Sequence, residues 1–100
     1  MVTPETRLKK DLKALLNERG AFWSAIAGGT YAKPGDPDII ACYKGYFIAI
    51  EGKTYEGSQS EWQKLRQCQV KKAGGIYAVI RSVDGLRKLL DFLDSIDARL

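Results

Sequence analysis

The chain has 100 residues, of which 45% are hydrophobic, so we expect one small domain with a core rather than a disordered chain. Lys and Arg number 16 against 12 Asp and Glu, which gives a net charge of +4 and a mild bias toward polyanionic partners. With no histidine and two isolated cysteines, the sequence excludes zinc sites of the usual Cys/His spacing and any mechanism with a histidine base. No stretch approaches a membrane span and no signal peptide precedes the first polar helix, so we expect a cytoplasmic protein.

The first predicted elements are a helix over residues 3–20 and a strand over residues 21–27. Thr3 suits an N-cap and Pro4 the first helical turn, and a stripe of leucines at helical spacing follows. Residues 28–35 form a loop that contains Tyr31 and Lys33. This loop is either a plain connection or a flap beside a functional site, with Tyr31 stacking on a base or sugar and Lys33 on a phosphate.

Residues 34–53 predict a β-hairpin. Two apolar runs, 39–43 and 46–50, flank a two-residue Lys-Gly connection, and both are rich in β-branched and aromatic residues. The two-residue loop pairs Tyr43 with Tyr46 at one end of the hairpin and places Asp38 directly opposite Glu51 at the other. Lys53 lies two residues beyond Glu51, so strand alternation sends it to the same face.

The opposed carboxylates are the unusual feature of this hairpin. Two acids held opposite one another repel, and a divalent cation such as magnesium compensates well because it prefers carboxylate oxygens. A lysine beside them suits metal-assisted hydrolysis of a phosphodiester. Taken separately, Pro-Gly-Asp-Pro-Asp is also ordinary turn chemistry, and Glu-x-Lys at a strand end is often a solvated pair.

The second half of the chain predicts helix, strand, helix. A capping box begins at Ser60 and opens a helix to residue 73 that carries Lys64 and Arg66, which are a solvated basic face or contacts to the DNA backbone. Residues 76–80 predict a buried strand, central in the sheet and parallel to its neighbour, and Ser82 caps the last helix. The hairpin is apolar on both faces, with Cys42 packed as a small apolar residue, so we expect an α/β fold with covered faces.

Taken in order, these segments resemble the PD-(D/E)XK nuclease superfamily, and more narrowly the VRR-NUC domains found alone in phages and at the end of larger repair nucleases. The resemblance runs from Glu5 to about Asp84 and rests on these segments: Pro37-Asp38, Glu51-Gly52-Lys53, Ser60-Glu61-Trp62-Gln63, Ala73-Gly74-Gly75 and Arg81-Ser82-Val83. It implies a single VRR-NUC-like nuclease domain over residues 1–100. The implied core is restriction-endonuclease-like, a mixed central sheet flanked by helices in the order α-β-β-β-α-β-α.

The resemblance also assigns roles to residues. Asp38 and Glu51 would bind Mg²⁺ or Mn²⁺, with the backbone carbonyl of Gly52 as a further ligand, and Lys53 would orient or activate the attacking water. The family usually has an apolar residue such as Val where this chain has Gly52, which can still offer a carbonyl.

Two further residues have open assignments. Gln63 either contacts a phosphate or the catalytic shell, as the family implies, or only caps the Ser60 amide; the family spacing favours the site. Glu5 either interacts with the dipole of the first helix or is a third carboxylate and metal ligand at the site.

We therefore expect a Mg²⁺- or Mn²⁺-dependent, structure-specific endodeoxyribonuclease that resembles a Holliday-junction resolvase and acts on branched DNA. If the gene belongs to a phage, the enzyme would work in the host cytoplasm. The alternatives are a non-catalytic DNA-binding module with a nuclease fold, and a flap or general deoxyribonuclease.

We also expect a homodimer, because a chain this short has no base-reading module and two sites at fixed separation can measure the shape of a four-way junction. The last helix carries an apolar stripe that is wider than one small sheet needs: Leu86, Leu89, Leu90, Phe92, Leu93, Ile96 and Leu100. This surplus indicates a partner surface. Alternatively, the helix only packs on the sheet, with Phe92 at the rim.

Overall fold

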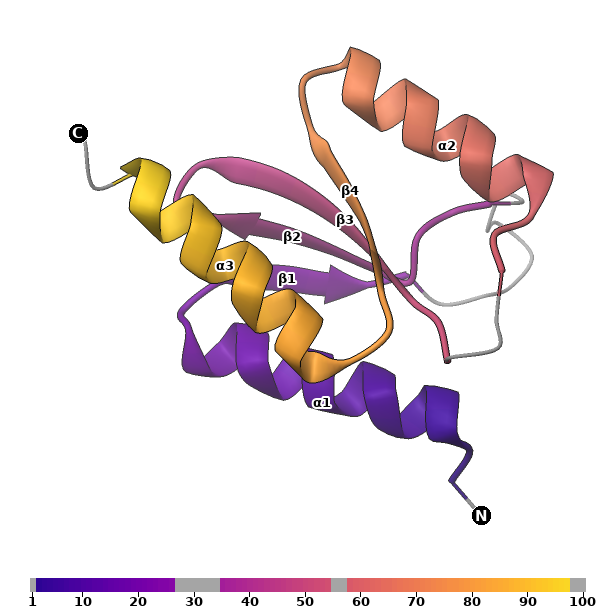
Figure 1. Ribbon diagram of the computed structural model, residues 1–100, viewed down its shortest axis with the longest axis horizontal. Coiled ribbons are helices and arrows are strands. Elements are labelled where there is room, and N and C mark those ends of the chain that lie inside the picture. Colours follow the sequence, from indigo (N-terminus) through magenta and orange to yellow (C-terminus); the bar gives the residue numbers. More distant parts are fainter. Residues whose placement is uncertain (1, 27–34, 55–57, 98–100) are drawn as a thin grey trace.

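The computed structural model describes residues 2–26, 35–54 and 58–97 (Figure 1). The elements, in chain order, are α1 (Pro4–Glu18), β1 (Phe22–Ala25), β2 (Ile39–Tyr43), β3 (Tyr46–Gly52), α2 (Glu61–Lys72), β4 (Ile76–Ile80) and α3 (Val83–Asp97). This α-β-β-β-α-β-α order confirms the predicted fold class. Tyr31 and Lys33 lie outside the described residues. No described helix is long and apolar enough to cross a membrane.

The four strands form one mixed sheet in the order β1-β2-β3-β4. β1, β2 and β3 pair antiparallel, and β4 pairs parallel with β3 after the α2 crossover. The parallel pairing was predicted, but the central position was wrong. β4 is an edge strand. It pairs with β3 on one side, and no further described strand pairs with its other side, since the chain continues from β4 into α3.

The predicted hairpin register is confirmed. Tyr43 pairs with Tyr46, and the pairing continues without a slip to Ile39 and Ile50. Lys44 and Gly45 both have positive φ, 50° and 88°, as the tight two-residue turns of β-hairpins require.

The hydrophobic core lies between the sheet and the helix pair α1 and α3, which pack against each other (Figure 1). Leu86, Leu90 and Leu93 of α3 are buried there, while Phe92 is 60% exposed. This burial agrees with the alternative in which the helix only packs, with Phe92 at the rim, and the partner surface on this helix stays a prediction. Most of the wide apolar stripe is at least partly buried, because α3 packs on α1 as well as on the sheet.

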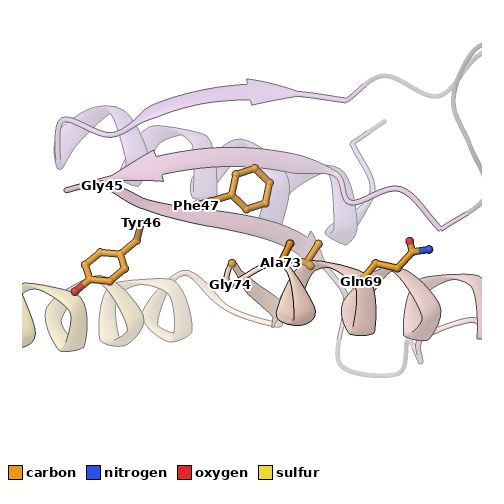
Figure 2. A pocket seen from close by; sticks show the side chains of 8 residues that line it. Gly45, Tyr46, Phe47, Gln69, Ala73 and Gly74 are labelled. Atoms are coloured by element: carbon orange, nitrogen blue, oxygen red, sulfur yellow. The ribbon is translucent and has the colours of Figure 1, made fainter.

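The opposite face of the sheet is only partly covered. α2 lies next to β4 and contains no fully buried residue, so Phe22 and Phe47 stay 73% and 45% exposed. Between the hairpin turn and the end of α2 there is a pocket of about 530 Å³, lined by residues that include Phe47, Ala73 and Gly74 (Figure 2). Cys42 is exposed on this face and not buried as predicted, because no described helix lies over its part of β2.

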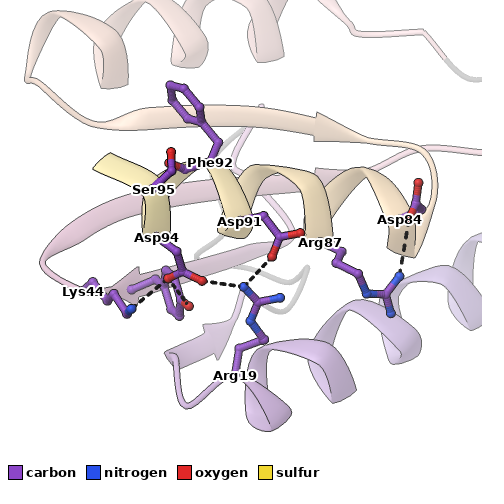
Figure 3. Close-up of polar contacts among 9 residues, drawn as sticks. Arg19, Lys44, Asp84, Arg87, Asp91, Phe92, Asp94 and Ser95 are labelled. Carbon is purple, nitrogen blue, oxygen red and sulfur yellow. Dashed lines mark hydrogen bonds and ion pairs between the residues drawn. The ribbon is translucent and has the colours of Figure 1, made fainter. Parts of the chain in front are cut away.

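A polar network ties α3 to the hairpin turn and to the end of α1 (Figure 3). Asp94 accepts a hydrogen bond from the Tyr43 hydroxyl at 2.7 Å and pairs with Lys44 at 2.9 Å and Arg19 at 2.7 Å. Arg19 also pairs with Asp91 at 2.8 Å. Lys44 and Tyr43 lower the pKa of Asp94 to about 2, so its carboxylate stays ionised at neutral pH. The network lies at the turn end of the hairpin, away from Glu51.

Gly35 is predicted to be irreplaceable by alanine. Its φ is +83°, and a Cβ there would lie 2.5 Å from the backbone carbon and oxygen of Trp62 in the first turn of α2. We expect Gly35→Ala to lower the free energy of unfolding by about 1–3 kcal/mol or more, from strain and overpacking together. Denaturant unfolding measures the loss.

Gly20→Ala is the matched control for this variant. Gly20 has a similar φ of +75°, but a Cβ there would meet nothing within 4 Å. It should lose only the strain, about 1–2 kcal/mol. Equal losses for the two variants would contradict close packing of the loop on α2.

Candidate functional site

Asp38 leaves the regular strand pairing at the open end of the hairpin. Its N–H donates to the Ile50 carbonyl at 3.0 Å, and its Oδ2 accepts a hydrogen bond from the Gly52 N–H at 2.8 Å. The last paired residues are Ile39 and Ile50, so Asp38 does not lie directly opposite Glu51 as predicted. The Asp38 carboxylate therefore accepts the hydrogen bond that a backbone carbonyl would accept in regular strand pairing, at the last residue of β3.

Lys9 of α1 neutralises this carboxylate. Its Nζ lies 3.2 Å from Asp38 Oδ1 and 4.0 Å from Glu5 Oε2. The structure thus brings Glu5 to the predicted site, through a lysine that the sequence analysis missed. The available signal was the i,i+4 spacing of Glu5 and Lys9, which puts both side chains on one helix face.

Glu51 is the buried charge of the site, with 1% of the residue exposed. The Tyr77 hydroxyl donates to its Oε2 at 3.4 Å, and its Oε1 has no hydrogen-bond partner among the residues that the structure describes. Burial raises the pKa of Glu51; the positive charge of Lys53 offsets part of this shift, and the negative charge of Asp38 adds to it. The site therefore favours a second cation, which would stabilise the ionised form.

Tyr77 and Gln59 complete the surroundings of Glu51, and the sequence analysis missed both. Burial and the negative charge of Glu51 raise the pKa of Tyr77 well above its usual value, so its hydroxyl remains a neutral donor. The Gln59 side chain lies beside Glu51 and lowers the carboxyl pKa, yet its buried Nε2 makes no hydrogen bond to a described residue. Only the register of β4 on β3 brings Tyr77 here, because it pairs Tyr77 with Ala49.

Lys53 and Gln63 lie where β3 ends and α2 begins. The Lys53 backbone N–H donates to the Ile80 carbonyl at 3.0 Å, and its side-chain charge reaches Glu51, as the influence on the Glu51 pKa indicates. Gln63 forms the capping box: its Oε1 accepts a hydrogen bond from the Ser60 N–H at 2.8 Å. Its catalytic role stays a prediction, beside this observed structural role.

The basic residues of α2 are placed differently from one another. Lys64 is exposed and pairs with Glu61 at 3.4 Å within its own helix. Arg66 is half-buried, donates to Gln69 at 2.7 Å and lies 3.6 Å from Asp36, in the loop before β2. Arg66 therefore links α2 to the loop that carries Asp38, and DNA contact by either side chain stays a prediction.

The oxygen atoms of this site suit a hard divalent cation. Asp38 and Glu51 supply carboxylates, and Glu51 Oε1 is a buried acceptor that lacks a described partner. In a strand, the N–H and C=O of one residue point to the same side, so the Gly52 carbonyl faces the Asp38 side of β3, as its N–H does. Within the described ranges no three acidic or cysteine side chains converge as a ready-made metal cluster, so the carbonyl, Glu5 or water would have to complete the shell.

Comparison with solved structures identifies the fold. A VRR_NUC domain superposes with a TM-score of 0.76 at 21% sequence identity, covering 89% of this chain and 96% of that one. The chain has a VRR_NUC fold. Hjc, a Holliday junction resolvase from the archaeal hyperthermophile Archaeoglobus fulgidus, superposes with a TM-score of 0.60 at 22% identity, covering 77% of this chain and 67% of that one. No protein-family model and no curated protein sequence matches the chain.

The likeness to the VRR_NUC domain confirms the predicted restriction-endonuclease-like core and the predicted similarity to VRR-NUC domains in fold. At these identities the likeness establishes the fold. The chemistry must therefore be argued from the residues of the site themselves.

Glu51→Gln tests whether burial raises the Glu51 pKa in the metal-free protein. A carboxyl with a raised folded pKa contributes most stability below its unfolded pKa, ordinarily 4.5, and loses that stability as pH rises through the folded pKa. Glutamine cannot ionise, so the variant should become more stable relative to the parent as pH rises, by about 1.4 kcal/mol for each tenfold increase in proton affinity that folding gives the carboxyl. Denaturant unfolding in chelator, from about pH 4 to about pH 8, measures how the stability difference between variant and parent changes with pH.

The exposed Glu61→Gln serves as the control, because no buried carboxylate is altered there. Its stability should change little relative to the parent across the same range. If Glu51→Gln instead loses stability relative to the parent as pH rises, then the folded pKa is not raised.

Proposed function

We propose that this protein is a Mg²⁺- or Mn²⁺-dependent endonuclease that hydrolyses phosphodiester bonds in branched DNA, in the manner of a Holliday-junction resolvase. The observation that carries the proposal is the buried Glu51 carboxylate, with Oε1 lacking a described partner, beside Asp38 and Lys53. A buried acid of this kind is destabilising unless a cation or proton compensates it. Its position in a nuclease fold supports a catalytic reason for keeping it.

In this proposal each side chain has a separate task. Asp38, Glu51 and the Gly52 carbonyl would hold the cation, and the hydrogen bond from Tyr77 to Oε2 of Glu51 leaves Oε1 as the oxygen available to it. A bound divalent ion supplies Lewis acidity at the phosphate and lowers the pKa of water. The Lys53 ammonium donates a hydrogen bond to the attacking water or to a phosphate oxygen, where negative charge grows in the transition state.

Branched DNA is the proposed substrate because the described elements include nothing suited to reading base sequence. Sequence-independent binding relies on phosphate contacts from lysine and arginine, and Lys64 on α2, together with Lys33, Tyr31 and Arg66, would provide them. One protein of similar fold is a Holliday junction resolvase, which supports junctions as the preferred shape.

We further propose a homodimer, with its interface on the half-covered face of the sheet instead of on α3. Phe22, Ile40, Cys42 and Phe47 line a nearly apolar surface there, next to the pocket at the end of α2. Two large aromatic side chains at least 45% exposed on one face are more than a small soluble sheet needs. Two copies joined on this face would hold two acid sites at a fixed separation, which a four-way junction requires.

One observation favours the rival reading, a DNA-binding module that does not cut. Both carboxylate oxygens of Asp38 already have protein partners, Lys9 and the Gly52 N–H. A chain that had lost catalysis could replace the cation permanently in this way. The intact Lys53 and the buried Glu51 argue against this reading, because neither is needed for phosphate binding alone.

Lys53→Ala should nearly abolish cleavage of a labelled four-way junction in Mn²⁺ while the protein still folds, with an unfolding midpoint lowered by the loss of the charge that compensates Glu51. The Lys53 side chain makes no described salt bridge, and the backbone bond to Ile80 survives the substitution. Loss of one transition-state donor costs about 10²–10³ in rate. Single-turnover cleavage of single strands, duplexes, flaps, splayed arms and junctions measures rate and preference together.

The exposed Lys88→Ala on α3 removes the same charge elsewhere and should cut at the parental rate. Full activity of Lys53→Ala, or of the parent in excess chelator, would sink the nuclease proposal. Binding of the junction without cleavage under all metal conditions would favour the rival module.

Phe47→Asp should convert the dimer to a monomer, whereas Phe92→Asp should not. Phe47 lies on the apolar sheet face, and Phe92 is equally large and 60% exposed but lies on α3. Burying an unpaired carboxylate in an apolar interface costs several kcal/mol, on the order of 2–5. Sedimentation at micromolar concentration should give about twice the 11.1 kDa chain mass for the parent and for Phe92→Asp. A monomeric parent would defeat the dimer and leave the nuclease proposal standing.

A further inference from the structure

Lys9 occupies an unusual position for a lysine. It projects from the second turn of α1 toward the end of β3, where its Cγ lies 3.3 Å from the place that a Cβ on Gly52 would take. Its ammonium then reaches Asp38 Oδ1 at 3.2 Å and faces Glu5 Oε2 at 4.0 Å. The absence of a side chain on Gly52 is what leaves room for the lysine stem. This is also where the family resemblance predicts an apolar residue.

The ammonium therefore contributes the positive charge that the acids of the site need. Asp38 has one oxygen on Lys9 and the other on the Gly52 N–H, so each oxygen of its carboxylate has a protein partner. Glu51 lacks such a partner for Oε1, and Lys53 influences it only through charge. A divalent cation that binds Asp38 through Oδ1 competes with the lysine, because both carry positive charge and approach the same oxygen.

We propose that Lys9 is an exchangeable counter-cation of this site, which holds Asp38 in the metal-free protein and swings to a DNA phosphate when a divalent ion binds. The inference rests on the proposed metal-dependent function and adds a residue that the resemblance did not assign. A lysine suits this exchange because its charge sits on a flexible four-carbon stem. The stem remains packed along Gly52 while the partly exposed ammonium changes partner.

Exchange of this kind has two opposite consequences. Without metal, Lys9 stabilises the fold, because its removal leaves Asp38 and Glu51 to repel each other with less compensation. With metal, Lys9 competes, because a single positive charge roughly 5 Å from a divalent ion weakens binding by about tenfold even at the dielectric constant of water. A salt bridge outside the metal site would give the first effect without the second, because its charge would be too far from the ion to repel it.

The test is Mn²⁺ binding to the purified protein, by calorimetry and by thermal unfolding with and without the ion. Lys9→Met keeps the length of the side chain and removes its charge. We expect a lower unfolding midpoint in chelator, Mn²⁺ affinity about tenfold tighter than the parental value, and a larger rise in midpoint on saturation with Mn²⁺. The exposed Lys10→Met, on the same helix, should change the Mn²⁺ affinity by less than about twofold, since water screens its charge.

A second variant protects the test against a Lys9→Met protein that fails to fold. Lys9→Arg keeps the charge and can hold a carboxylate through two hydrogen bonds, so it should weaken Mn²⁺ binding relative to the parent. If the parent binds Mn²⁺ and neither variant shifts the affinity in its expected direction, then the exchange is overturned while the nuclease proposal stands. If neither the parent nor Lys9→Met binds Mn²⁺, the metal-dependent function itself fails, and the exchange fails with it.

Discussion

Burial of the Glu51 carboxylate is the constraint on which the open end of the sheet depends. Moving an ionised carboxylate out of water costs several kcal/mol unless protein groups or ions replace the lost hydration. This protein answers with a neutral hydroxyl from Tyr77 and with charge from Lys53, and Oε1 is left without a described partner. This compensation is incomplete, and the proposed cation would supply the remaining positive charge.

The buried core and the Glu51 side of the candidate site lie on different faces of the same sheet. The face toward α1 and α3 holds the buried core and is closed at the turn end by the Arg19 and Asp94 network. Glu51 and Tyr77 point to the other face, where α2 contributes no fully buried side chain. A substitution near Glu51 can therefore change the chemistry while most of the packing free energy is retained. Asp38 and Lys9 stand at the boundary, where α1 reaches the end of β3.

The sequence predicted those features that local rules determine. The Lys44-Gly45 turn set the hairpin register, since a two-residue loop between β-branched runs allows little else. The spacing of Ser60 and Gln63 likewise predicted a capping box, and both of its hydrogen bonds are present. Each of these depends on residues close together in the chain.

Features that depend on docking between distant segments were predicted poorly. The contact of Lys9 with Asp38 requires α1 to cross Gly52, and no pattern within either segment reveals that distance. The stripe of α3 was judged against one partner surface, but the helix has two. Cys42 was expected to be buried because both faces of its strand are apolar, and apolar pattern alone does not show where α2 ends.

The light anchoring of α2 has a consequence for motion. Its side chains bury little apolar surface, so a subglobal opening that lifts α2 from β4 should require far less free energy than global unfolding. Such an opening would admit water to Glu51 while the α1 and α3 core remains intact. Amide hydrogens of α2 would then exchange faster than those of β3. Glu51 would thus be buried in most molecules and exposed to solvent in the minor open population. An ion could reach it in that population without unfolding of the domain.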